Sequence, residues 1–169
     1  MHLDLALVLN LISTLAIVGA LIFTGLQVRE ANRARRDQAS VAVIQATQSE
    51  SWTRALDLLG RLPENADLKE IEQSPPETQR ALFEFGVRIE TIGYMVYRGI
   101  VRFELVDELI GGVTLMYWAR ARKWAENERE RTGNAKFLEW CQWFTTQVAA
   151  RHAQGLHRPA YLRDLRCPE

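Results

Sequence analysis

The sequence of 169 residues has few of the side chains that build metal centres and disulfide frameworks. It contains two cysteines and three histidines. Two cysteines cannot make a disulfide framework or, alone, a four-ligand zinc site. His152 and His157 are five residues apart and so do not share a helix face, and no Glu-x-x-His motif occurs. The sequence therefore predicts no metal ion and no cofactor.

An excess of charge of either sign is also missing. Lysine plus arginine and aspartate plus glutamate each number 21, so the net charge is zero. A general nucleic-acid binder carries a basic excess, and we therefore expect no nucleic-acid partner. Hydrophobic residues make up 47% of the chain and charged residues 25%, which excludes wholesale disorder.

Motifs of catalytic chemistry are absent as well. Gly111-Gly112 is not followed by Gly-Lys-Ser or Gly-Lys-Thr, and Gly-x-Ser-x-Gly does not occur. Cys141 is interpreted as a small core residue. Carboxylates are plentiful, but their places beside arginines or at helix starts favour structural roles; they are Glu84, Glu90, Glu104, Asp107 and Glu108. We therefore expect a protein that is not an enzyme.

The sequence does contain one long stretch without charge. No charged residue lies between Asp4 and Arg29. A bilayer core of about 30 Å requires about 20 apolar residues in a helix, so residues 5–28 predict a membrane-spanning helix. The alternatives are a buried helix of a soluble protein and a cleaved signal peptide. A signal peptide has a basic start and a small-residue cleavage site, and because both are missing an uncleaved anchor is favoured.

Arginines follow this stretch on one side only. Arg29, Arg33, Arg35 and Arg36 come after it, and no lysine or arginine precedes it. The positive-inside rule places such a flank in the cytoplasm, so we expect a single-pass protein with its N-terminus outside. The four arginines are interpreted as contacts to the membrane surface, with a partner protein as the alternative.

Small residues recur at four-residue spacing within the uncharged stretch. They are Ala16, Ala20 and Thr24. Such a stripe lets another helix approach closely in lipid, although small residues are frequent in spanning helices generally. We hypothesise that the stripe packs against a helix of another membrane protein subunit.

Behind the anchor, apolar residues recur every three to four positions, which is typical of helices with one buried face. No proline or glycine lies between Gly25 and Gly60, so the anchor helix is predicted to continue to Gly60. Ser74 is predicted to cap the next helix, and Gly99 and Gly133 are predicted to end helices, Gly99 in a left-handed conformation. The predicted helices have these apolar faces: Val41, Ile44, Gln48, Trp52, Ala55 and Leu59; Leu82, Phe85, Ile89, Ile92 and Val96, widened by Phe83, Val87 and Met95, in 75–98; Leu105, Leu109, Val113 and Met116 in 103–132; and Phe137, Cys141, Phe144 and Val148 in 134–154.

No strand pattern occurs, and the sequence predicts an all-α fold. In this fold an N-terminal transmembrane helix continues into a cytoplasmic antiparallel helical bundle. The predicted parts are the membrane anchor with its basic flank at 1–36, the helical bundle at 37–155 and a C-terminal tail at 156–169.

Tryptophans are concentrated near the end of the chain. Trp118, Trp124, Trp140 and Trp143 lie within 26 residues. Tryptophan is favoured in cores, at membrane interfaces and in the hot spots of protein interfaces. Four are more than a small bundle needs in its core, so we expect at least one to face a partner or the lipid surface. We assign Trp118 and Trp124 to this contact.

The order of these features is similar to that of a widespread family of uncharacterised bacterial single-span membrane proteins. The resemblance is carried by the stretch 27–36 (QVREANRARR) after the span, by Trp52, by 97–109 (YRGIVRFELVDEL) and by 137–144 (FLEWCQWF). The step between two helices shows Tyr97, Gly99, Glu104 and Leu105, and it departs from the family pattern at 100–103, where a polar capping residue is usual. The resemblance implies bacterial origin, hence the inner (cytoplasmic) membrane, and this architecture. It implies no activity and no catalytic residue.

These observations favour a non-catalytic accessory or scaffolding subunit that packs against a larger bacterial membrane complex, such as a photosynthetic or respiratory one. Its expected partners are other membrane protein subunits and the lipid bilayer. One alternative is a membrane-anchored sensor or regulatory protein that binds a small ligand or a cytoplasmic partner. A membrane-tethered enzyme is the third possibility, and it is disfavoured because the sequence shows no set of catalytic residues.

Overall fold

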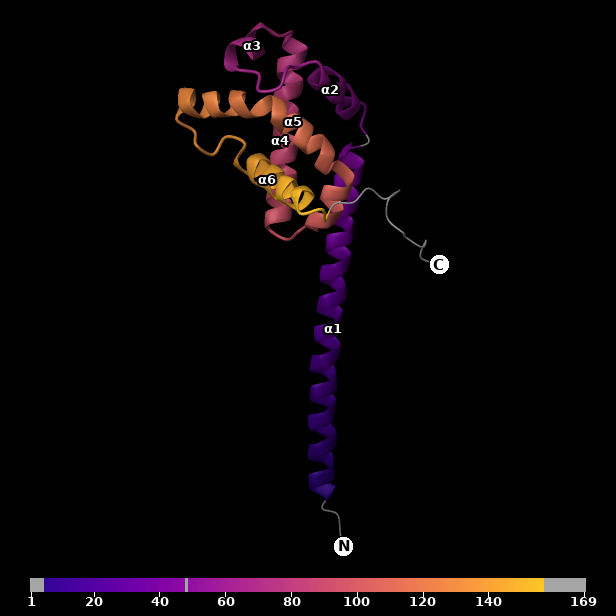
Figure 1. Cartoon of the computed structure of the whole chain (residues 1–169). Coiled ribbons are helices and arrows are strands. Elements are labelled where there is room, and N and C mark those ends of the chain that lie inside the picture. Colours follow the sequence, from indigo (N-terminus) through magenta and orange to yellow (C-terminus); the bar gives the residue numbers. More distant parts are fainter. Residues whose placement is uncertain (1–4, 48, 157–169) are drawn as a thin grey trace. The chain divides into compact units, whose positions relative to one another are not determined.

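The computed structural model describes residues 5–47 and 49–156 (Figure 1). All regular elements in these ranges are helices, which confirms the all-α fold and the helical bundle. Only Leu156 of the predicted C-terminal tail lies inside the described ranges. The six helices are α1 (Leu5–Thr47), α2 (Glu50–Gly60), α3 (Leu68–Gln73), α4 (Pro76–Tyr97), α5 (Phe103–Thr132) and α6 (Glu139–Ala153).

Helix α1 contributes to two compact units, which divide after Gln38. In the first unit, the segment Ile12–Arg35 is long and apolar enough to cross a membrane, judged by length and composition. Successive large apolar side chains, such as Leu21, Ile22 and Phe23, are all exposed, so the helix shows apolar groups on every side rather than along one face.

The predicted single helix up to Gly60 is wrong, because the chain leaves the helical conformation at Ser49. Helix α1 ends at Thr47 and α2 begins at Glu50, because Ser49 takes an extended backbone and its Oγ accepts a hydrogen bond from the Trp52 N–H at 3.3 Å. Serine is a strong N-cap, and a cap here starts a new helix without any proline or glycine. Trp52, Ala55 and Leu59 are buried as predicted. Val41 is exposed, the side chain of Ile44 is not described, and Gln48 lies outside the described residues.

Ser74 closes one helix rather than opening the next. Its Oγ donates a hydrogen bond to the Ile71 carbonyl at 2.7 Å, at the end of α3. Helix α3 itself starts with a capping box between Asp67 and Glu70. Pro75 occupies the N-cap position of α4 and makes no side-chain cap. The prediction of Ser74 as the cap of α4 is therefore wrong.

Helix α4 lies at the centre of the second unit and packs against both α2 and α6. Its five predicted core residues, Leu82, Phe85, Ile89, Ile92 and Val96, are all buried, whereas Phe83 and Val87 are 51% and 43% exposed and do not widen the face as predicted. Aromatic rings connect three helices, since Phe85 lies 4.5 Å from Trp52 and 5.0 Å from Tyr117 between ring centroids. The Tyr117 hydroxyl donates to the Leu82 carbonyl at 3.1 Å.

Helix α5 is continuous through Gly111-Gly112. Its buried face differs from the predicted one, because Leu109 is 45% exposed. The face consists instead of Val106, Asp107, Ile110, Gly111, Thr114, Tyr117, Trp118, Ala121, Trp124 and Ala125. A buried aspartate, glycine and threonine interrupt the apolar pattern of this face. The hydrophobic pattern of the sequence therefore predicted adjacent apolar residues of α5 as the buried face instead.

Glycines with left-handed backbone conformations follow α4 and α5. Gly99 and Gly133 have φ angles of +65° and +69°, which confirms their predicted roles. Helix α6 begins at Glu139, five residues later than predicted, after Leu138 with φ +54°.

Glu90 of α4 caps the first turn of α6 from outside that helix. Its Oε2 accepts a hydrogen bond from the Cys141 N–H at 2.8 Å, and the Trp140 N–H also faces the carboxylate. The N-terminus of a helix carries orphan N–H groups and a positive partial charge, so a carboxylate there satisfies both. Burial nevertheless raises the pKa of Glu90 above its usual value of 4.5, and its hydrogen bonds to Cys141 and Trp140 oppose that rise.

Glu90→Gln is expected to change the dependence of stability on pH. Because the folded pKa is raised, the folded state holds the proton more tightly, so this group stabilises the fold below pH 4.5 and the benefit disappears as pH rises through the folded pKa. The free energy of unfolding of the Gln variant minus that of the wild type should therefore increase with pH above 4.5 and then level off. Denaturant titrations across this range measure it, and a difference that falls with rising pH would contradict the prediction.

Candidate interaction surface

Trp118 and Trp124 do not lie on a contact surface, which corrects the sequence prediction. Their side chains are 9% and 7% exposed. Both lie on the buried face of α5, and the Trp124 ring meets the Phe137 ring edge to face at 5.3 Å between centroids. The reason is the register of α5, whose buried face includes these two positions together with small and polar residues.

The other two tryptophans lie in an exposed aromatic cluster. We call Tyr94, Tyr97, Trp140 and Trp143 the aromatic surface. Tyr97 lies 4.5 Å from Trp140 and 5.4 Å from Trp143 between ring centroids, and Tyr94 lies 5.6 Å from Trp140. The tyrosines are 42% and 56% exposed, and both tryptophans are partly exposed. The partly exposed pair is therefore Trp140 and Trp143 rather than the pair assigned from the sequence, and contact of a tryptophan with a partner or with lipid stays a prediction.

Helix geometry explains how the four rings meet. The tyrosines are three residues apart on α4 and the tryptophans are three apart on α6, so each pair lies on one face of its helix. The two helices approach closely at Gly93, where a Cβ atom would lie 2.5 Å from the Trp140 carbonyl oxygen. A glycine at the crossing thus brings the two aromatic pairs into one cluster.

The edge of the aromatic surface is basic. The Arg98 guanidinium carbon lies 5.9 Å from the centroid of the Tyr94 ring. Arg102 is exposed in the turn between α4 and α5, and Ile100 in the same turn is 42% exposed. No aspartate or glutamate occurs between Glu90 and Glu104. A cation beside an electron-rich ring face is favourable, so Arg98 is held next to the cluster.

A groove continues from the aromatic surface along α6, and a charged network lies beside it. Tyr97, Phe103, Trp143 and Arg151 are among its lining residues. Arg151 contacts a fully buried carboxylate, Asp107, through its Nε at 3.1 Å from Oδ2.

His152 completes this network, with its Nε2 3.1 Å from Oδ1 of Asp107. The Arg151 and His152 side chains are 24% and 26% exposed, so both connect the buried carboxylate to the surface. Asp107 lies among acidic residues at the start of α5, where carboxylates are usual, and the sequence pattern therefore offered no sign of its burial. The network joins the beginning of α5 to the end of α6 and is interpreted as structural.

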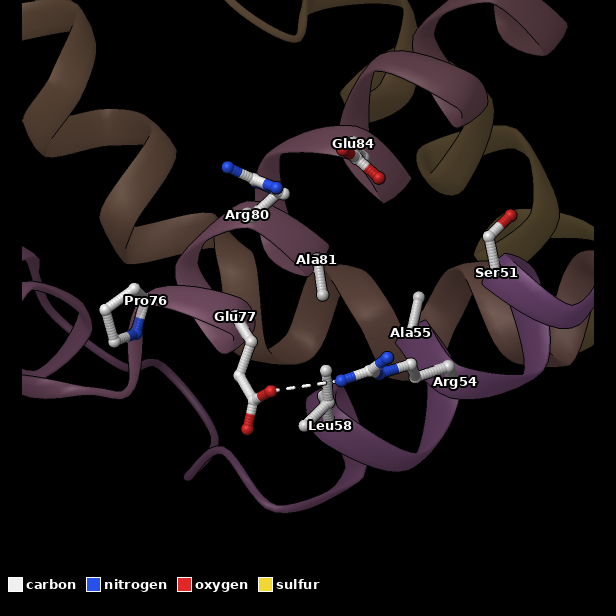
Figure 2. Close-up of a pocket in the computed structure, with 9 residues that line it drawn as sticks. All are labelled: Ser51, Arg54, Ala55, Leu58, Pro76, Glu77, Arg80, Ala81 and Glu84. Carbon is white, nitrogen blue, oxygen red and sulfur yellow. Dashed lines mark hydrogen bonds and ion pairs between the residues drawn. The ribbon is translucent and has the colours of Figure 1, made fainter.

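A second groove lies between α2 and α4 (Figure 2). Its floor contains Ala55 and Ala81, which are almost buried, and an ion pair between Arg54 and Glu77 at 3.1 Å spans it. Both charged side chains are more than half exposed, so the pair contributes little to stability. The two alanines let the helices approach, and the groove follows from their small size.

Arg88 connects the same two helices. Its guanidinium donates to Ser51 Oγ at 3.0 Å and to Ser49 Oγ at 3.3 Å. The arginine therefore holds the N-terminal end of α2 against α4.

The predicted anchor residues are exposed along α1. Ala16, Ala20 and Thr24 lie on the apolar segment, and the Thr24 hydroxyl donates to the Ala20 carbonyl at 2.8 Å. Arg29, Arg33 and Arg35 are exposed, and the side chain of Arg36 lies outside the described residues.

Among the side chains of 5–47 and 49–156 that are described, no group of three or more His, Cys, Asp or Glu residues could hold a metal ion. Cys141 is fully buried on α6, as predicted, and burial raises the pKa of its thiol far above the usual range. A thiol held in its protonated form is a poor nucleophile.

The sequence model of one protein family, described as a domain of unknown function (DUF4760), matches residues 12–148. No curated protein shows a significant match to the sequence. No solved structure shows one either. The matched range begins inside the apolar segment of α1 and ends in α6, so it covers most of both compact units.

Proposed function

The chain belongs to the family of the domain of unknown function DUF4760, and from that premise we propose that it is a non-catalytic accessory subunit of a larger bacterial membrane complex. In this proposal α1 spans the inner membrane once and the second unit binds the complex from the cytoplasmic side. The family match supports an uncharacterised domain family and carries no activity with it.

The observation that carries the proposal is the exposure of apolar side chains around α1. From Ile12 to Val28 the large apolar side chains are between 46% and 68% exposed, and they occupy every side of the helix. Such a helix would expose a large apolar surface to water, whereas a bilayer accepts it on all sides. The arginines from Arg29 to Arg35 support a cytoplasmic location for the end of the span.

The small-residue stripe supports a helical partner within the membrane. Ala16, Ala20 and Thr24 form a shallow line along α1, and because the Thr24 hydroxyl bonds to its own helix it adds no unpaired donor in lipid. Val18 and Ile22 lie on the opposite side, since two residues turn the helix by about 200°. The stripe therefore provides one face on which a neighbouring helix can lie close.

Ala20→Leu should remove the partner from the protein. The larger side chain overpacks a close helix contact at a cost of about 1–3 kcal/mol, so we expect about a tenfold loss of co-purifying chains. The tagged full chain is purified in mild detergent from its native membranes, and co-purifying chains are quantified. Ile22→Leu places the same residue on the opposite face and should leave recovery unchanged.

Three results would contradict the proposal. The wild type could be purified only as a free monomer, or both variants could retain the same partners as the wild type. The chain could also be extracted from membranes by alkaline buffer without detergent, which would show that α1 does not span the bilayer.

A further inference from the structure

We propose that the aromatic surface docks on the headgroup region of a bilayer that contains anionic phospholipid. The inference rests on the proposed membrane anchor, because α1 would keep the second unit near lipid. It assigns a function to Tyr94, Tyr97, Trp140 and Trp143, four side chains that the core of the second unit leaves partly or largely exposed.

The chemistry of the four rings fits a membrane–water interface. Tyrosine and tryptophan have an apolar ring and a polar tip, and both are enriched at the level of the lipid headgroups. The rings gather from two helices into one cluster, with Tyr97 in contact with both tryptophans. Ile100, in the turn that follows α4, is 42% exposed and adds an apolar side chain near Tyr97.

Charge next to the cluster favours anionic lipid over a neutral surface. Arg98 and Arg102 are exposed in the turn after α4, and residues 91–103 contain no carboxylate. On the other helix of the surface, Glu139 lies next to Trp140 and Arg151 is paired with the buried Asp107, so the basic charge beside the cluster comes from the turn after α4. Basic residues beside a bilayer attract anionic headgroups.

A lipid surface is favoured over a soluble protein partner because the anchor would raise the effective concentration of the bilayer at the aromatic surface. Tethering by α1 would make the encounter with the bilayer intramolecular, so weak contacts of a few rings and arginines suffice. If a second copy of the chain or another protein binds this surface instead, the experiment below detects it.

The tryptophans supply the measurement, because all five lie between positions 52 and 143 and none lies in α1. The full chain is reconstituted into vesicles of phosphatidylcholine brominated near the top of the acyl chain, with or without an equal amount of phosphatidylglycerol. Bromine quenches only indoles that reach the interface. We expect strong quenching in the anionic vesicles, weaker quenching in the neutral ones, and reversal by high salt.

Arg98→Gln combined with Arg102→Gln should lower the docking equilibrium constant about 30-fold, which corresponds to about fivefold for each arginine near an anionic surface. Arg54→Gln combined with Arg80→Gln removes the same charge from the groove between α2 and α4 and should leave quenching unchanged. Trp140→Phe combined with Trp143→Phe should abolish most quenching, because Trp52, Trp118 and Trp124 are buried.

The results separate this inference from the proposed function. A chain that resists alkaline extraction from the vesicles but shows no quenching overturns the docking alone. Quenching that is unchanged by the Arg98 and Arg102 substitutions and by phosphatidylglycerol also overturns the docking. Chemical cross-linking between the aromatic surfaces of two copies in the vesicles overturns it as well. A chain that alkaline buffer removes from the vesicles overturns both the anchor and the docking.

Discussion

Gly93→Ala is expected to lower the free energy of unfolding by about 2 kcal/mol. The added Cβ would lie 2.5 Å from the Trp140 carbonyl oxygen and 3.0 Å from its carbonyl carbon. Both atoms belong to the backbone of α6, so no side-chain rotation relieves the clash and the helices must separate. Overpacking of this kind costs about 3 kcal/mol, and the better helix propensity of alanine offsets about 1 kcal/mol of it.

Gly112→Ala is the matched control for this substitution. Gly112 also lies inside a helix, but no atom lies within 4 Å of its added Cβ, so we expect a gain of about 0.5–1 kcal/mol. Denaturant unfolding in mild detergent, followed by tryptophan fluorescence, reports on the second unit because α1 has no tryptophan. Equal effects of the two substitutions would show that α4 and α6 do not cross closely at Gly93.

The hydrophobic pattern predicted the buried face of α4 well and that of α5 poorly, because such a pattern detects only large apolar residues. In α4 the buried face also includes Thr78, Gly86 and Gly93, but every turn from Leu82 to Val96 adds a large apolar residue to it, so the period of 3.6 residues is visible in the pattern. In α5 the buried face includes Asp107, Gly111 and Thr114, which a hydrophobicity pattern treats as surface. Asp107 is accommodated because Arg151 and His152 of α6 contact its carboxylate, and such partners are tertiary information. The Thr114 hydroxyl instead donates to the Ile110 carbonyl of its own helix at 2.9 Å.

The aromatic surface could be predicted only in part. The spacing of three between Tyr94 and Tyr97 and between Trp140 and Trp143 places each pair on one face of its helix, although no aromatic cluster was predicted from it. The place where the two faces meet depends on the crossing at Gly93 and on the capping of α6 by Glu90. Both contacts join residues about 50 positions apart, so no local pattern could separate the exposed tryptophans from Trp118 and Trp124.

Asp107→Asn is expected to destabilise the second unit by about 3 kcal/mol. The carboxylate is fully buried, with its Oδ2 3.1 Å from Arg151 Nε and its Oδ1 3.1 Å from His152 Nε2. Removing one partner of a buried ion pair leaves an uncompensated charge, which costs about 3–5 kcal/mol. Arg151 is 24% exposed and keeps some hydration, so the lower end of that range applies.

The same substitution at a surface pair provides the control. Asp57→Asn removes a partner of Arg61 at 2.7 Å, but both side chains are more than 60% exposed, so we expect less than about 0.5 kcal/mol. In a double-mutant cycle, Arg151→Gln should cost much less in the Asp107→Asn background than in the wild type, because the arginine has already lost its buried partner. Additive costs would instead mean that Asp107 acts through the helix packing at Gly111, where its carboxylate lies against the position of the absent Cβ, and not through the ion pair.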